Sequence, residues 1–390
     1  MEEKEIGIYV HIPFCKKKCY YCDFSSYPDK INSQSRYVEC VKQEILQYAT
    51  ENRVMSKYDL EPKYTVDTIY IGGGTPSIID SNLIYQIVKC IKTKFNVKEK
   101  TEITIEVNPG TVTKKKLEEY KEIGINRLSI GLQATQDDIL KGIGRIHTYS
   151  QFLETYNMAR EVGFNNINVD LMIALPGQTL EDVKESIKEI IELKPEHISV
   201  YSLILEEGTL LYKMVEDKKM ELPTDEEERE MYWYVKKKLE KHKYYQYEIS
   251  NFAKYGFESK HNMNCWNQKE YIGIGAAASS FLNDARYSNI SNIEQYMQNI
   301  EDGTQNKNLI LEEKLTLESK MKEYMMLGLR KIQGVNILEF ERKFKINPVV
   351  RFCKELEKLN HEGLIIVIDE NIQLTNKGID FANLVWEEFI

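Results

Sequence analysis

The feature that most restricts the fold is an alternation of short apolar segments with amphipathic segments over the first half of the chain. The apolar segments are rich in isoleucine and valine, and stretches of roughly 10 to 20 residues with helical periodicity separate them. This pattern is typical of βαβ units arranged around a parallel sheet. Six strands are expected, at residues 6–12, 66–71, 102–107, 127–131, 167–174 and 197–203.

The number of units favours an open barrel over a closed one. A closed barrel of this class needs eight strands, and only six are expected here, so we predict an α/β fold with a partial (βα)6 barrel. Unusual residues gather where the strands end, namely three cysteines, three consecutive glycines, Glu106 and Gln133. Because ligands bind at the carboxyl ends of parallel strands, this edge is the expected functional site.

The rest of the chain changes character twice. We predict a partial barrel at residues 1–206, a segment that covers the barrel at residues 207–305, and a further domain at residues 306–390. In this last part, helical periodicity precedes a short hairpin and a final helix, which predicts a winged-helix-like α+β domain. Its first helices are expected at residues 316–332, 336–344 and 349–361, and its hairpin at residues 364–374.

Composition and charge exclude several classes of protein. The 390 residues carry a net charge of −9, which argues against a nucleic-acid partner, because affinity for phosphates comes from Lys and Arg. No stretch has the roughly 20 apolar residues of a membrane span, and the acidic start MEEKEIG lacks the pattern of a signal peptide. The seven cysteines, an odd number, indicate free thiols in a reducing compartment. We therefore expect a cytoplasmic protein.

Three of the cysteines form a compact motif. Cys15, Cys19 and Cys22 follow the first expected strand with the spacing C-x3-C-x2-C. This spacing is too tight for a good set of disulfides, and three ligands are one short of a closed structural zinc site. Three thiolates can instead hold three irons of a 4Fe-4S cluster and leave the fourth iron open. The alternatives are a zinc site completed by Cys265 or His261, or a chance grouping.

Two motifs together resemble those of the radical S-adenosylmethionine (SAM) superfamily. The first is Cys15-x3-Cys19-x2-Cys22 with Tyr21 before the last cysteine, and the second is GGGTP at residues 72–76. In that superfamily the amino and carboxylate groups of SAM bind the open iron, and the glycine-rich strand end contacts SAM through its backbone. Glycines suit this role because they let the backbone approach a ligand closely.

Further motifs are similar to those of the oxygen-independent coproporphyrinogen III oxidase family. They are YVHIPFC, YCDF, IEVNPGT, RLSIGLQ, GRIHT, NVDLMIALPGQT and ISVYSLILEEGT, and the resemblance covers essentially the whole chain. It implies a SAM site in which carboxylates accept hydrogen bonds from amine or hydroxyl groups and an arginine binds the SAM carboxylate. The residues that match are Tyr9, Gly73, Gly74, Thr75, Glu106, Gln133, Arg145, Asp170 and Ile204.

Two features separate the oxidases from the haem-chaperone (HemW-type) branch of this family. The cluster motif of the oxidases resembles C-x3-C-x2-C-x-C, whereas this chain has Phe24 at the position of the last cysteine. The oxidases also have a longer segment before the cluster motif, whereas this chain has 14 residues before Cys15. The chaperone branch has a motif resembling H-N-x-x-Y-W, and this chain has HNMNCW at residues 261–266. The match implies haem contacts by His261, Cys265 and Trp266. Ordinary packing in a loop or core is the competing explanation for these three residues.

The resemblance therefore implies a haem chaperone that passes haem to acceptor haemoproteins, including membrane-associated respiratory enzymes, and that holds a 4Fe-4S cluster with SAM. The alternative is an enzyme, the oxygen-independent coproporphyrinogen III oxidase, which converts coproporphyrinogen III to protoporphyrinogen IX by radical decarboxylation. The residues leave open whether the protein is an enzyme. A third class, a winged-helix nucleic-acid binder, is disfavoured by the negative net charge.

Overall fold

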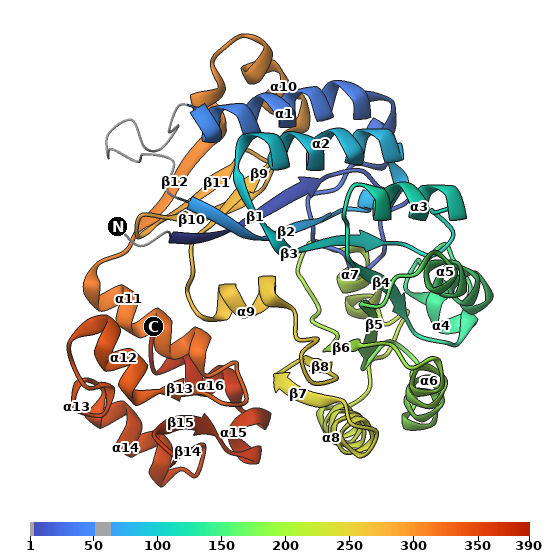
Figure 1. Ribbon diagram of the computed structural model, residues 1–390. Coiled ribbons are helices and arrows are strands. Elements are labelled where there is room, and N and C mark those ends of the chain that lie inside the picture. Colours follow the sequence, from blue (N-terminus) through green and yellow to red (C-terminus); the bar gives the residue numbers. More distant parts are fainter. Residues whose placement is uncertain (1–3, 51–63) are drawn as a thin grey trace.

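One mixed sheet runs through the main body of the molecule (Figure 1). The structure is a computed structural model that describes residues 4–50 and 64–390. The first three residues of the acidic N-terminus and residues 51–63 of the predicted 1–206 domain lie outside the described residues. Within the described part, the sheet has twelve strands in the order β12-β11-β10-β9-β1-β2-β3-β4-β5-β6-β8-β7.

The centre of the sheet consists of six parallel strands that lie side by side in chain order. They confirm the predicted α/β fold with a partial (βα)6 barrel. The six strands are β1 (Lys4–Ile12), β2 (Tyr64–Gly73), β3 (Asn96–Val107), β4 (Arg127–Gln133), β5 (Ile167–Ile173) and β6 (His197–Ser202). The helices between them are α1 (Gln34–Thr50), α2 (Ser81–Lys94), α3 (Lys114–Glu122), α4 (Asp137–Gly142), α5 (Tyr149–Val162) and α6 (Leu180–Leu193).

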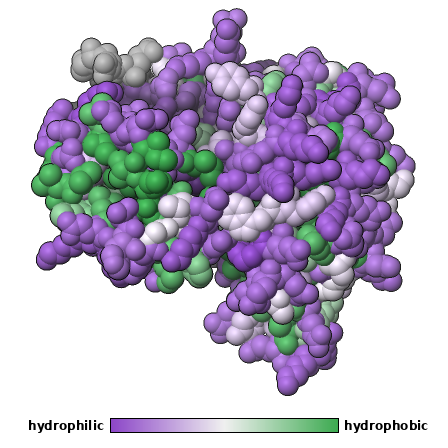
Figure 2. Space-filling view, turned by 90° about the horizontal axis from the view of Figure 1, so that it is seen from below, coloured by the Kyte–Doolittle hydropathy of each residue, from purple (hydrophilic) through white to green (hydrophobic). Residues whose placement is uncertain are grey.

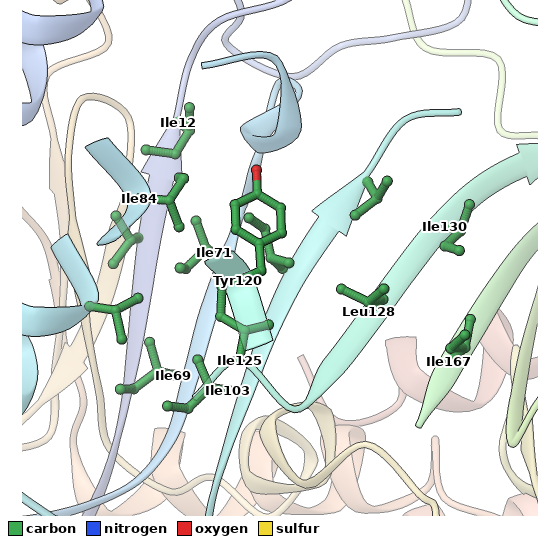
Figure 3. Packing of buried hydrophobic residues seen from close by; sticks show 14 of the residues in the cluster. Ile12, Ile69, Ile71, Ile84, Ile103, Tyr120, Ile125, Leu128, Ile130 and Ile167 are labelled. Carbon is green, nitrogen blue, oxygen red and sulfur yellow. The ribbon is translucent and has the colours of Figure 1, made fainter. Parts of the chain in front are cut away.

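The two faces of these strands differ in polarity. Ile69 and Ile71 of β2, with Leu128 and Ile130 of β4, are fully buried in the layer between the sheet and the helices (Figure 3). Side chains alternate along a strand, so the residues between them point to the opposite, inner face. Along β2 and β4 these inner residues are polar, and the inner face is therefore where chemistry can take place. Helices α1, α2 and α3 cover the outer face (Figure 1).

The segment after β6 extends the sheet at both edges. β8 (Asn251–Ala253) pairs antiparallel with β6, and β7 (Tyr245–Glu248) follows it at that edge. β9 (Tyr271–Ile274) pairs parallel with β1, and β10 (Ser279–Leu282), β11 (Ala285–Asn289) and β12 (Leu309–Lys314) continue outward. The division of the chain at residues 206 and 305 stays a prediction. Helices α7 (Leu210–Glu216), α8 (Asp225–Lys241), α9 (Lys260–Trp266) and α10 (Ile293–Glu301) belong to this segment.

The C-terminal part has the predicted order of helices, hairpin and final helix. Its apolar cluster includes Leu329, Phe340, Phe352 and Val385. A three-stranded sheet has the order β13-β15-β14, with β14 (Ile365–Ile368) and β15 (Asn371–Leu374) as the hairpin and β13 (Val335–Asn336) beside it. The helices are α11 (Leu317–Gly328), α12 (Ile337–Phe344), α13 (Pro348–Arg351), α14 (Cys353–His361), α15 (Asn376–Asp380) and α16 (Ala382–Glu387).

Two surface properties of the molecule complete the description. Hydrophobic side chains gather on the side where the C-terminal domain lies, and Ile366, Val367 and Ile368 of β14 are among its exposed apolar residues (Figure 2). In the part of the chain that the structure describes, none of the helices has both the length and the apolar character needed to cross a membrane.

Candidate functional site

The cysteine motif lies directly after β1, at the carboxyl edge of the sheet. Cys15 is buried, whereas Cys19 and Cys22 are partly exposed, and all three are free thiols. The Cys15 Sγ atom lies 3.4 Å from the Thr75 Oγ1 atom at the end of β2. No three His, Cys, Asp or Glu side chains of the described residues converge on a single metal ion. A cubane cluster does not require that, because each thiolate binds a different iron.

The chemistry of these thiols fits a soft-metal cluster. Burial raises the pKa of Cys15, and it raises the pKa of Cys22 to about 11. Neighbouring Cys19 raises both pKa values further, so the thiols lie close enough to affect each other's charge. Without a metal these two thiols are neutral at pH 7. Metal binding must therefore release protons, as thiolate coordination does in general.

The glycine-rich end of β2 is joined to the cysteine loop through the backbone. Gly73 has φ of 114°, and a Cβ atom there would lie 2.6 Å from the His11 ring. The Gly74 N–H donates to the Ile12 carbonyl at 2.9 Å, and a Cβ atom on Gly74 would lie 2.7 Å from the Phe14 carbonyl oxygen. Only glycine tolerates such close approach together with a positive φ.

Glu106, at the end of β3, contacts the same glycine-rich segment. Its carboxylate accepts hydrogen bonds from the Tyr70 hydroxyl at 2.9 Å and from the Gly73 N–H at 3.1 Å. Burial raises the pKa of Glu106 to about 7, although these two hydrogen bonds favour the ionised form. The side chain is therefore close to half ionised at neutral pH. A cationic amine nearby would hold it in the charged form.

Tyr9 lies on the inner face of β1 with His11. The Tyr9 hydroxyl is 3.0 Å from His11 Nδ1, and His11 Nε2 is 2.9 Å from the Ser25 carbonyl oxygen. A carbonyl only accepts hydrogen bonds, so Nε2 carries the proton and Nδ1 accepts from Tyr9. Burial lowers the pKa of His11, which keeps the ring neutral. This chain of contacts ties β1 to the loop beyond the third cysteine.

Arg145 brings the cysteine loop and β4 together. Its Nη1 atom lies 3.6 Å from Cys19 Sγ, and its Nη2 atom donates to the Gly131 carbonyl at 2.5 Å and to the Asn108 side chain. The Nε atom is buried without a hydrogen-bond partner, which leaves one donor available for an anion. Gln133 has a left-handed φ of 77°, at a bulge in the pairing of β4 with β5.

The other two predicted SAM residues, Asp170 and Ile204, differ in their surroundings, because Asp170 is hydrogen-bonded and Ile204 is exposed. The Asp170 carboxylate accepts hydrogen bonds from the Ser129 hydroxyl at 3.0 Å and from the Asn168 amide at 2.7 Å. Its pKa is raised by burial. Asp170 is therefore already held by one residue of β4 and one of its own strand β5, and a ligand would add to this network. Ile204 follows β6 and is 71% exposed, so this residue is open to solvent at the edge.

Some residues that shape this region were not predicted from the sequence. His11 and Tyr70 both contact predicted site residues, and neither was expected to do so. Both lie on the inner face of a strand, two residues from another polar residue on that face. A period-two pattern of polar residues within β1 and β2 is the signal that could have identified them.

The predicted haem histidine lies on α9, against the inner face of the barrel. His261 Nδ1 is 3.0 Å from the Thr68 hydroxyl, and its ring lies 5.2 Å from the Tyr70 ring. Burial lowers the pKa of His261 to about 4, so the imidazole is neutral, the form that binds metals. The Glu102 carboxylate of β3 accepts hydrogen bonds from the first N–H groups of α9, those of Lys260 at 3.2 Å and His261 at 3.1 Å.

Cys265 and Trp266 face a different environment. Together with Tyr271 they line a cavity of about 160 Å³, which is smaller than the roughly 300 Å³ of the smallest usual ligand pockets. The Arg330 guanidinium lies 4.6 Å from the Trp266 ring and 4.5 Å from the Trp386 ring, which joins α9 to the C-terminal domain. Burial raises the pKa of the Cys265 thiol to about 11. The structure thus separates His261 from Trp266.

Comparison with family models defines the class of the protein. A model described as "Radical SAM superfamily" matches residues 9–190, and a model described as "HemN C-terminal domain" matches residues 315–381. The solved structure of coproporphyrinogen III oxidase (HemN) from Escherichia coli superposes on the whole chain and on 90% of its own length, with a TM-score of 0.84 and 24% identity. The chain therefore contains a radical SAM domain and a HemN C-terminal domain, and its fold is that of the HemN structure.

Curated relatives define the family more closely. "Heme chaperone HemW" of Bacillus subtilis is 37% identical over 98% of both chains. The protein of the same name from Lactococcus lactis is 35% identical over 100% of this chain and 98% of its own. The chain belongs to the HemW family.

Proposed function

We propose that this protein binds haem and transfers it to acceptor haemoproteins, and that it carries a 4Fe-4S cluster with SAM as a ligand. The observation that carries the proposal is the full-length identity of 35 to 37% to relatives named heme chaperone. Acceptors that include membrane-associated respiratory enzymes, and action in the cytoplasm, are parts of the same proposal.

The cluster assignment rests on the donor set at the end of β1. Cys15, Cys19 and Cys22 would hold three irons, and Phe24 cannot serve as a further ligand. Phe24 is 61% exposed at the surface of the loop. It occupies the position at which the motif of the oxidases has a fourth cysteine. When bound, the cluster supplies an open iron that can hold SAM and transfer an electron to it.

The SAM assignment rests on groups at the same edge that are still able to bind a ligand. Arg145 has an unpartnered Nε–H group that fits a carboxylate. Glu106 offers acceptor oxygens for an amine or a hydroxyl group, and the glycine-rich segment presents backbone at close range. Tyr9, Thr75, Gln133, Asp170 and Ile204 lie along the strands and loops that form this edge.

The haem assignment rests on His261. Its Nδ1 atom faces the Thr68 hydroxyl, and its Nε2 atom makes no hydrogen bond to any of the described residues. A ligating histidine usually donates its other ring N–H group to a fixed acceptor, which orients the ring. Thr68 can be that acceptor. Cys265 and Trp266 would contribute through packing around α9, because they line a small cavity whose lining does not include His261.

The experiment is a haem titration of purified, cluster-loaded protein, followed by absorption in the Soret region. We expect a shifted Soret band that saturates at one haem per chain, and we expect the His261→Ala variant to lose or displace it. The matched control is His242→Ala, which changes an exposed histidine after α8. If the wild type gives no Soret shift, or if His261→Ala binds and transfers haem like the wild type, the proposal is wrong.

A further inference from the structure

β2 and β3 each carry one residue toward α9 and another toward the glycine-rich edge. On β2, Thr68 contacts His261, and two residues later Tyr70 contacts Glu106. On β3, Glu102 accepts hydrogen bonds from the start of α9, and Glu106 lies four residues further on. Residues at even spacing share one face of a strand. The candidate haem residue and the candidate SAM site are therefore built on the same face of the same two strands.

Tyr70 makes contact with both sites. Its hydroxyl donates to Glu106 Oε1 at 2.9 Å, and its ring packs on the His261 ring with a centroid distance of 5.2 Å and an angle of 31°. The other carboxylate oxygen of Glu106 accepts from the Gly73 N–H at 3.1 Å. A continuous set of contacts thus runs from the glycine-rich edge to the histidine of α9.

Gly72 makes room for this arrangement. A Cβ atom at Gly72 would lie 2.9 Å from Tyr70 Cε1 and 3.0 Å from Glu106 Oε1. Any side chain there would press against both partners of the hydrogen bond. The absence of a side chain at Gly72 is thus a requirement for the contact between Tyr70 and Glu106, apart from any direct contact with a ligand.

We propose that Tyr70 is a positioning residue that couples the two sites, so that SAM bound beside Glu106 increases the affinity of the protein for haem at His261. This inference rests on the proposed function. By thermodynamic reciprocity, bound haem then increases the affinity for SAM by the same factor.

The direction of the coupling follows from the hydrogen bond to Glu106. A hydrogen bond to an ionised carboxylate is stronger than one to the neutral acid. SAM carries a sulfonium charge, and a cation near Glu106 favours its ionised form. The Tyr70 ring is then held more firmly, and with it the ring surface on which His261 packs. A histidine that is already ordered loses less entropy when it binds haem.

The test measures haem affinity of the cluster-loaded, full-length protein by Soret titration, with and without saturating SAM. SAM binding is measured separately by equilibrium dialysis, with and without haem. The variants are Tyr70→Phe, which removes only the hydroxyl, and Gly72→Ala, which pushes the same pair apart. The matched control is Tyr64→Phe on the same strand, because the Tyr64 hydroxyl also donates to a carboxylate, that of Glu270, at 3.0 Å.

For the wild type and Tyr64→Phe we expect SAM to tighten haem binding by about fivefold or more, the usual lower range of coupling between two sites. For Tyr70→Phe we expect a ratio near one, while this variant still binds both ligands separately. Gly72→Ala should also lower the ratio, and it should weaken SAM binding as well, because the added Cβ atom presses on Glu106. If the wild type binds haem equally well with and without SAM, or if Tyr70→Phe retains the full ratio, the coupling is disproved and the proposed function remains. If the wild type binds no haem at all, both fail.

Discussion

Arg145 and Cys19 are in direct contact, although 126 residues separate them in the chain. The Arg145 Nη1 atom lies 3.6 Å from the Cys19 Sγ atom, and the same guanidinium donates to the Gly131 carbonyl. A residue predicted to bind SAM therefore touches a residue predicted to bind the cluster. Arg145 can thus serve both proposed ligands.

The first prediction concerns Arg145. Replacing Arg145 with Gln should weaken SAM binding by about 10- to 100-fold, because a charge-assisted hydrogen bond contributes about 1.5–3 kcal/mol. Equilibrium dialysis of the cluster-loaded protein measures this. Iron and sulfide analysis of the same sample shows whether the cluster is still present. The control is Arg36→Gln, which removes an exposed arginine that pairs with Glu301. Equal SAM affinities of the two variants would contradict the assignment of Arg145.

The second prediction concerns the cluster ligands. Cys22→Ala should lose most of the iron and sulfide after anaerobic reconstitution, because two thiolates cannot replace three on a cubane cluster. Cys353→Ala should keep the full cluster, since Cys353 is an exposed cysteine of the C-terminal domain. Absorption near 400 nm together with iron analysis gives the result. A Cys22→Ala variant with wild-type iron content would show that the cluster lies elsewhere.

The third prediction is a pH dependence that comes from Glu106. Burial places its pKa at about 7, so the carboxyl takes up a proton as the pH falls through 7. The neutral acid attracts a cationic ligand less, and SAM affinity should therefore fall by about tenfold between pH 8 and pH 6. Glu106→Gln should bind SAM weakly, and its SAM affinity should not show this fall between pH 8 and pH 6. The same pH dependence in the wild type and in Glu106→Gln would assign it to another group.

The fourth prediction concerns the attachment of α9. Glu102→Gln should lower the free energy of unfolding by about 1–2 kcal/mol, because the carboxylate accepts two N–H groups at the start of that helix. Glu99→Gln, at an exposed position of the same strand, should have little effect. Denaturant titration of both variants compares the two values. If the two variants are equally stable, the contact with Glu102 does not hold α9 in place.

The central strands could be predicted from sequence because their isoleucines and valines follow a simple pattern. Ile69 and Ile71 are buried as that pattern requires. The limits of the elements were less accurate. β3 begins at Asn96, six residues before the predicted start. The strands from β7 to β12 were not predicted, because they have only three to six residues each. In addition, β8 and β9 join the central sheet through β6 and β1, which are distant in the sequence.

The candidate SAM site could be predicted largely from motifs, but its connections could not. The contact of Tyr70 with both Glu106 and His261 depends on the register of β2 against β3 and on the position of α9. A sequence motif also does not show which way its side chains point. His261 and Trp266 are five residues apart on a helix, which directs them about 140° apart around its axis. This explains why, within HNMNCW, His261 contacts Thr68 and Tyr70 whereas Trp266 lines the cavity with Tyr271.

The most direct test of the central claim compares haem transfer with porphyrinogen decarboxylation on one cluster-loaded sample. One portion is loaded with haem and mixed with an acceptor apo-haemoprotein, and the other is incubated anaerobically with SAM, a reductant and coproporphyrinogen III. We predict that haem moves to the acceptor and that no protoporphyrinogen IX forms. Formation of protoporphyrinogen IX without haem transfer would contradict the account and would identify the protein as an oxidase.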